Sequence, residues 1–234
     1  MGLGIVVGFT PDEDDEEGAV WFRAQMAIAN RLLARHGFPP QEEGSHVPEG
    51  ESRSSLDGFG YSALHYLRRA AAHRRIDPNW IATPVSDGGD PTQDSALEKA
   101  GADRDFHLLV HSDCEGFYLP VDFAPVLFDD RPAPPGIIRG LVQQLLGSAP
   151  KPEEMLAGGM LGSSVRLRRE LVEVAPALGI DLAEDGTLSD QEAARIDQAV
   201  MEETSPLQRE LMVWLALYEA ARLSIEHKRA IVFC

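Results

Sequence analysis

FHLLVHSDCEGFYLPVDF, residues 106–123, contains two apolar runs separated by a short polar segment. Successive side chains of a strand point to opposite faces, so the apolar residues of each run share one face: Phe106, Leu108 and Val110 in the first, and Phe117, Leu119, Val121 and Phe123 in the second. Five connecting residues match a common hairpin loop length, and Ser, Asp and Gly favour such loops. The stretch therefore predicts a central antiparallel hairpin of 106–111 with 117–123.

Apolar runs near both ends of the sequence predict two further strands, LGIVVGF at 3–9 and AIVFC at 230–234. Helical spacing of apolar residues and helix start and stop signals predict helices near 19–36, 61–75, 137–147, 165–178, 190–204 and 206–227. Ser189 with Glu192 and Ser205 with Gln208 have the spacing of capping boxes. These elements predict an α+β fold in which terminal strands join the hairpin in a small mixed sheet, covered by five or six helices.

The domain organisation expected from the sequence is a single domain over residues 1–234. Polar, turn-rich stretches near 39–58 and 84–95 indicate surface loops, and a Pro/Gly-rich insertion lies near 129–158. None of these stretches separates segments that would fold alone.

The 234 residues include 38 acidic and 21 basic side chains, which gives a formal net charge of -17. This charge opposes an encounter with a phosphate backbone, so no nucleic-acid binding is expected. It suits solubility, and it suits a basic protein partner attracted by complementary charge. The sequence shows no membrane-spanning run, no secretory signal and only two cysteines, from which we expect a cytoplasmic protein.

The polar segment between the two apolar runs has a second interpretation. His111, Asp113 and Glu115 could supply one nitrogen and two carboxylates to a divalent metal, or His111 could activate the Cys114 thiol. Neither spacing matches a named motif, and an i, i+2, i+4 ligand set requires an extended loop. The hairpin turn is therefore the favoured interpretation, and no cofactor or metal is expected.

Two basic clusters contrast with the acidic composition, one at Arg68–Arg75 and one at Arg166–Arg169. The second follows a glycine-rich segment that leads into a helix, where exposed amide groups form a ready anion site. A phosphate or carboxylate site is therefore predicted from five residues: Gly162, Ser163, Ser164, Arg166 and Arg169. The alternative is a capped helix whose arginines pair with the surplus carboxylates.

Three stretches resemble a family of uncharacterised bacterial cytosolic proteins: FGYSALHYLRR at 59–69, HSDCEGFYLPVDF at 111–123 and GGMLGSSVRLRREL at 158–171. The resemblance implies no activity, because none is known for that family. We therefore expect a non-enzymatic binding or regulatory protein, such as an immunity-type inhibitor whose acidic surface meets a basic protein. The alternative function is a metal- or cysteine-dependent hydrolase centred on the 111–115 turn.

Overall fold

A computed structural model describes residues 2–8, 16–48, 50–56, 58–86, 88–101, 103–111, 116–129 and 155–233. Its main sheet has five strands in the order β2-β7-β4-β6-β5. The pair β4 and β6 is parallel, and the other neighbours are antiparallel. The strands are β2 (Ile5–Val7), β4 (Gly116–Leu119), β5 (Leu127–Phe128), β6 (Met160–Ser163) and β7 (Ile231–Phe233). A two-stranded sheet pairs β1 (Gly2–Leu3) with β3 (Phe59–Gly60).

Seven α-helices lie in the described part of the chain, where five or six were expected. Together with the small mixed sheet they confirm the predicted α+β class. They are α1 (Glu16–Arg35), α2 (Tyr61–Ile76), α3 (Ser95–Ala100), α4 (His107–Val110), α6 (Ser164–Val174), α7 (Asp190–Met201) and α8 (Gln208–His227). The described residues also form short 3-10 helices at Pro91–Gln93, Ala157–Gly159 and Ala175–Leu178. The helix predicted near 137–147 lies outside the described residues.

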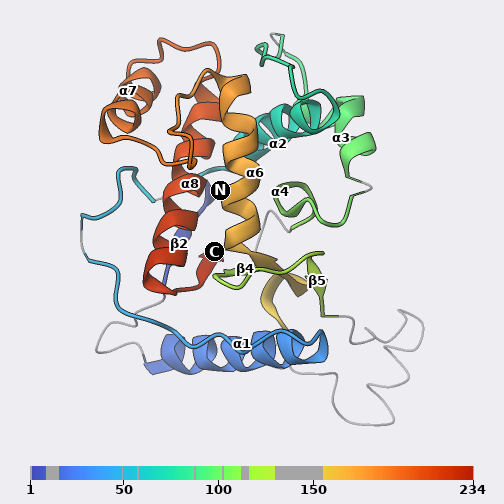
Figure 1. Cartoon of the computed structure of the whole chain (residues 1–234), viewed down its shortest axis with the longest axis vertical. Coiled ribbons are helices and arrows are strands. Elements are labelled where there is room, and N and C mark those ends of the chain that lie inside the picture. The colour runs from blue at the N-terminus through green and yellow to red at the C-terminus, as the bar shows by residue number, and fades with distance from the viewer. Residues whose placement is uncertain are drawn as a thin grey trace.

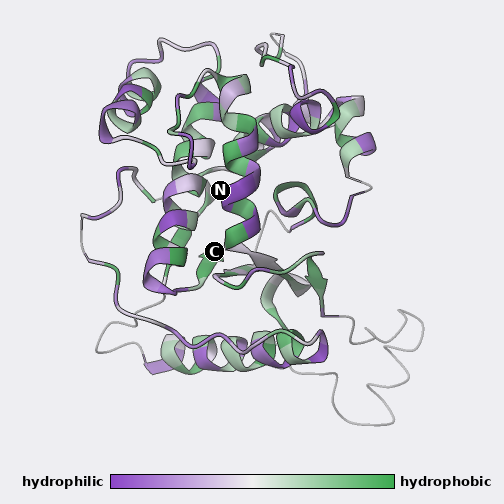
Figure 2. Cartoon of the chain, viewed as in Figure 1, coloured by the Kyte–Doolittle hydropathy of each residue, from purple (hydrophilic) through white to green (hydrophobic). Residues whose placement is uncertain are grey.

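The sheet separates two apolar cores, and alternation along its strands supplies both. On β4, Phe117 and Leu119 pack with residues of α1, whereas Tyr118 belongs to the larger core with α2, α6 and α8. Figure 1 shows this layering, with α1 alone beyond one side of the sheet and the other helices grouped beyond the opposite side. Segments of α1 alternate between hydrophobic and hydrophilic along its length (Figure 2), as a helix with only one covered face requires.

Both predicted terminal strands are present in shorter form, as β2 and β7, and they pair directly with each other, whereas Leu3 of the predicted first strand lies in β1 of the two-stranded sheet. Ile5 faces Phe233 across the antiparallel pair of β2 and β7. The second neighbour of β7 is β4, where Val232 faces Phe117. The C-terminal strand therefore lies inside the sheet, between two partners, as its apolar β-branched sequence predicted.

The predicted hairpin of 106–111 with 117–123 is wrong. Residues 107–110 form α4, and β4 pairs with β7 and β6 instead. Both ends of this short helix are held by distant side chains. The Glu170 carboxylate accepts the amide N–H groups of His107 and Leu108 at 2.8 and 2.7 Å, and buried Arg68 donates to the carbonyls of Leu108 and His111 at 2.8 and 2.7 Å. These contacts outweigh the local strand pattern.

The second run also forms a shorter strand than predicted. It leaves the sheet after Leu119, where Pro120 has no N–H to donate to a neighbouring strand. The predicted burial of its apolar face is nevertheless confirmed for Phe117, Leu119 and Phe123, while Val121 is partly buried.

Candidate protein-binding surface

A loop and the helix that follows it carry a concentration of negative charge. Residues 181–203 contain a single basic residue, Arg195, and eight acidic ones: Asp181, Glu184, Asp185, Asp190, Glu192, Asp197, Glu202 and Glu203. All of the acidic residues except Glu192 are exposed. We refer to the outward side chains of these residues as the 181–203 surface.

The loop that opens this surface is fixed from beneath by the core. The hydroxyl of buried Tyr218 on α8 donates to the carbonyl of Gly186 at 2.7 Å and accepts the amide N–H of Leu188 at 3.1 Å. Gly186 has a φ of 78°, which favours glycine at this turn. Arg168 of α6 also donates to the Gly186 carbonyl, at 3.2 Å. The loop is thus held by two helices of the core.

The helix α7 is anchored by its inward face. Ser189 caps it by accepting the amide N–H of Glu192 at 3.1 Å, so the predicted capping residue is confirmed. Ala193 and Ile196 are buried, and α7 packs on α8. The second predicted capping residue, Ser205, instead accepts from Leu207, and α8 begins at Gln208 without a side-chain cap.

Most carboxylates of the surface form no ion pair with another described residue. Glu192 pairs with Arg195 at 2.6 Å, and Asp190 pairs with Arg53 at 3.2 Å. The remaining six form no ion pair within the described part of the chain. This arrangement leaves their charge available to a partner.

Local contacts keep two of these carboxyl groups ionised. Hydrogen bonds from Thr187 lower the pKa of Asp185, and the guanidinium of Arg195 lowers the pKa of Glu192. An apolar side chain accompanies the charge, because Met201 at the end of α7 is 77% exposed. The surface therefore offers fixed negative charge around one exposed apolar group.

The basic clusters found in the sequence are engaged inside the protein. In the first cluster, Arg68 donates to backbone carbonyls, as described above. Arg69 pairs with Asp94 at 2.8 Å, and Arg75 pairs with Asp103 at 2.8 Å. These pairs reduce the positive charge that α2 presents to a ligand. The charge of Arg69 and Arg75 is thus compensated by neighbouring carboxylates.

The residues of the predicted anion site lie together at the start of α6, and their polar groups have protein partners. Ser163 donates its amide N–H to Nδ1 of His107 at 3.0 Å, and its hydroxyl donates to the carbonyl of Val121 at 2.6 Å. Buried Ser164 accepts from the hydroxyl of Ser224 at 2.8 Å. The Ser163 amide and both serine hydroxyls therefore face neighbouring protein groups, and the anion site stays a prediction.

The two arginines of that predicted site share one carboxylate. Arg166 and Arg169 pair with Asp122 at 2.6 and 2.9 Å. Gly162 lies against the ring of Tyr118, so closely that an added Cβ would be 2.4 Å from the ring. The pairing of the arginines with a carboxylate is the alternative that the sequence left open, and an anion would have to compete with Asp122.

Of the alternative catalytic residues, only His111 is among those that the structure describes. It is 2% exposed, donates from Nε2 to the carbonyl of Phe117 at 3.0 Å, and stacks on Tyr118 with 4.1 Å between ring centroids. Asp113, Cys114 and Glu115 lie outside the described residues. The hydrolase interpretation therefore stays a prediction.

Sequence reasoning missed the 181–203 surface because it treated the acidic excess as a property of the whole chain. The available signal was local: eight acidic residues and one basic residue within a segment that also carries helix start signals. A count of charge by segment would have found it.

Fold and surface together define an acidic α+β protein in which one loop and the helix after it carry six carboxylates without an ion pair among the described residues. The sequence matches a family described as "Putative DNA-mimic protein" over residues 1–233, and the chain belongs to this family. No curated protein and no solved structure matches it. Within the described residues, no helix combines the length and the apolar character needed to cross a membrane.

Proposed function

We propose that this protein binds a basic DNA-binding protein at the face which that partner uses for DNA, and that the 181–203 surface makes the contact. The observation that carries the proposal is the set of six exposed carboxylates on one anchored loop and helix that have no ion pair with any residue the structure describes. Family membership supports the same function, because a DNA mimic presents negative charge in place of phosphates.

Physical considerations favour this surface as the contact. DNA-binding proteins neutralise phosphates with Lys and Arg, so a competitor must present several carboxylates that are not already paired. The anchoring by Tyr218 and Arg168 lowers the cost of ordering the loop on binding. A narrower form of the proposal is an immunity-type inhibitor, in which the basic partner is a toxin that acts on nucleic acid.

The test is competition between the protein and DNA for one partner. The protein is immobilised and used to capture basic proteins from a lysate of the native host. Each captured protein is then purified and bound to a fluorescent DNA duplex. We expect the free protein to displace the duplex, with an association rate that falls steeply with salt because exposed charges are screened over about 8 Å at physiological ionic strength.

A matched pair of variants locates the contact. The first neutralises Glu184, Asp197, Glu202 and Glu203 to the corresponding amides. The second neutralises four exposed residues elsewhere that also lack ion pairs within the described residues: Glu42, Asp77, Glu98 and Asp105. Each variant removes the same charge.

We expect the first variant to lose at least tenfold in displacement and the second to lose less than threefold. Equal losses would assign binding to net charge alone. Captured proteins that do not bind DNA would contradict the proposed function.

A further inference from the structure

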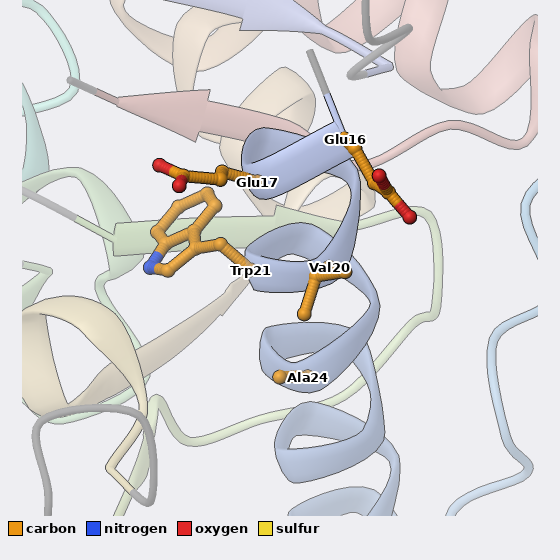
Figure 3. A pocket seen from close by; sticks show the side chains of 5 residues that line it. All are labelled: Glu16, Glu17, Val20, Trp21 and Ala24. Carbon is orange, nitrogen blue, oxygen red and sulfur yellow. The ribbon is translucent and has the colours of Figure 1, made fainter.

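A second feature lies at the start of α1, outside the 181–203 surface. A pocket of about 650 Å³ is lined there by Glu16, Glu17, Val20, Trp21 and Ala24 (Figure 3). The pocket lies beside the apolar core that takes Phe22 and Met26 of the same helix, and Trp21 stands at the boundary between the two. We refer to this feature as the Trp21 pocket.

The indole of Trp21 forms an aromatic wall of the pocket. It is 38% exposed, and its ring centroid lies 6.0 Å from that of buried Phe117 on β4. This contact holds one part of the ring at the edge of the core and leaves the rest accessible. Val20, which is 54% exposed, adds apolar surface beside it.

One carboxylate lies next to the aromatic wall, and a second is on the other side of the helix start (Figure 3). Glu17 precedes Trp21 by one helical turn, and Figure 3 shows its carboxylate beside the indole. Neither Glu16 nor Glu17 forms an ion pair within the described residues. In the sequence, four further acidic residues at 12–15 come directly before them. The charge of Glu16 and Glu17 by itself exceeds the partial positive charge at the start of α1, so the pocket favours a cation.

An aromatic face next to a carboxylate fits a guanidinium group. Its plane stacks on an indole by a cation–π interaction, while its N–H groups form charge-assisted bonds with a carboxylate. The same combination occurs inside this chain. The guanidinium of Arg69 lies 5.7 Å from the ring centroid of Trp80 and pairs with Asp94 at 2.8 Å.

We propose that the Trp21 pocket receives an arginine side chain of the DNA-binding partner, an inference that rests on the proposed function. Arginine is the cation that such partners carry for phosphates and bases. The charge of Glu16 and Glu17 is complementary to it, and the exposed indole gives arginine an advantage over lysine. The pocket thus adds side-chain selectivity to the long-range attraction of the acidic surface.

The experiment measures binding of two fluorescent nonapeptides, one of nine arginines and one of nine lysines, to the full chain at physiological salt. We expect the wild type to bind the arginine peptide about 3- to 10-fold more tightly, as a cation–π contact predicts. Trp21→Leu keeps an apolar side chain but removes the aromatic face, so it should abolish this preference. Trp21→Phe should keep part of it, and thermal melts report whether each variant is folded.

The variant of Glu184, Asp197, Glu202 and Glu203 is the control for charge. It should weaken binding of both peptides while their affinity ratio stays unchanged. A preference for arginine that survives Trp21→Leu would overturn the inference. Equal binding of both peptides by the wild type would also overturn it but leave the proposed function standing, whereas binding of neither would contradict both.

The Trp21 pocket could instead be filled by a second copy of the chain, and a further measurement distinguishes this outcome. Sedimentation of the wild type and of Trp21→Leu reports whether this pocket joins two copies. A dimer that dissociates on Trp21→Leu, together with an unchanged peptide preference, would assign the pocket to self-association instead of an arginine.

Discussion

Glu170 is a buried carboxyl group on α6 that caps the start of α4. It is 7% exposed and accepts the two amide N–H groups described above. Burial raises its pKa to about 8, because desolvation outweighs these hydrogen bonds. Burial has the opposite effect on the neighbouring imidazole of His107, whose pKa it lowers to about 4.

These two shifts predict the pH dependence of stability. The stability that protonated Glu170 contributes is complete below its ordinary pKa of 4.5 and is lost as the pH rises toward 8. The stability from neutral His107 is present above 6.5 and lost as the pH falls toward 4. Between pH 4.5 and pH 6.5 the two groups change the stability in opposite directions. Between pH 6.5 and pH 8 only Glu170, of these two groups, changes it.

We therefore expect the free energy of unfolding to fall by about 1–2 kcal/mol from pH 6.5 to pH 8, and this fall to be absent in Glu170→Gln. Urea titrations at several pH values measure it. Glu98→Gln, at an exposed position on α3 with no ion pair within the described residues, serves as the control and should retain the wild-type slope. A slope that persists in Glu170→Gln would show that another group titrates.

The predicted anion site is tested by thermal scans in phosphate and in chloride at matched ionic strength. Phosphate at about ten times its dissociation constant would stabilise the fold by about 1.4 kcal/mol and raise the Tm by roughly 3–6 °C. Arg166→Ala should abolish the gain, and Asp122→Asn should increase it because Asp122 now pairs with both arginines. Equal shifts in the wild type and Arg166→Ala would contradict the site.

At the scale of the elements, α8 carries a buried carboxylate that joins three parts of the chain. Glu219 is 0% exposed and binds Arg53 at 2.6 Å and Arg222 at 3.0 Å. Burial alone would raise the pKa of the Glu219 carboxyl, but hydrogen bonds from the two arginines outweigh it and lower the pKa. Arg53 also donates to the carbonyl of Leu188 at 2.7 Å, directly before α7.

We expect Arg53→Ala to destabilise the fold by about 2–3 kcal/mol, because it leaves a buried charge with one partner instead of two. The loop before α7 should also exchange its amide hydrogens faster. Arg195→Ala is the matched control, since it breaks an arginine–glutamate pair at the surface, and it should cost less than about 1 kcal/mol. Chemical unfolding and hydrogen exchange measure both. Equal costs would show that Arg222 alone satisfies Glu219.

The elements that the sequence predicted correctly are those whose signals are local. The periods of α1, α2, α6, α7 and α8 and the apolar terminal strands can be read within a window of one element. The hairpin could not be predicted correctly in this way. Whether 106–111 is strand or helix depends on Glu170 and Arg68, which are distant in the sequence and meet it only in the fold.

At the scale of the whole molecule, the sequence indicated an acidic protein suited to a basic partner, and the family agrees with this class. It did not indicate where the free charge lies. Net charge is a sum over the chain. In the fold, two arginines of α2 and two of α6 are paired with carboxylates, whereas the 181–203 surface has a single arginine for eight acidic residues. Only the pairing pattern in the fold separates compensated from free carboxylates.

The free carboxylates should cost stability, because like charges gathered on one surface repel each other in the compact state. We expect the Tm at neutral pH to rise as sodium chloride increases from about 10 to 150 mM, since salt shortens the range of this repulsion. The variant of Glu184, Asp197, Glu202 and Glu203 should be more stable than the wild type at low salt, by about 0.5–2 kcal/mol, and less sensitive to salt.

The control variant of Glu42, Asp77, Glu98 and Asp105 separates local from global repulsion in calorimetric scans at low and high salt. It changes the net charge equally but removes carboxylates that lie on other elements. A smaller gain than in the first variant would show that repulsion is concentrated on the 181–203 surface. A Tm that does not depend on salt, or a loss of stability in the first variant, would show that these carboxylates are satisfied within the fold. If the charge of this surface is retained for binding, we expect it to lower the stability of the fold and its neutralisation to raise the stability.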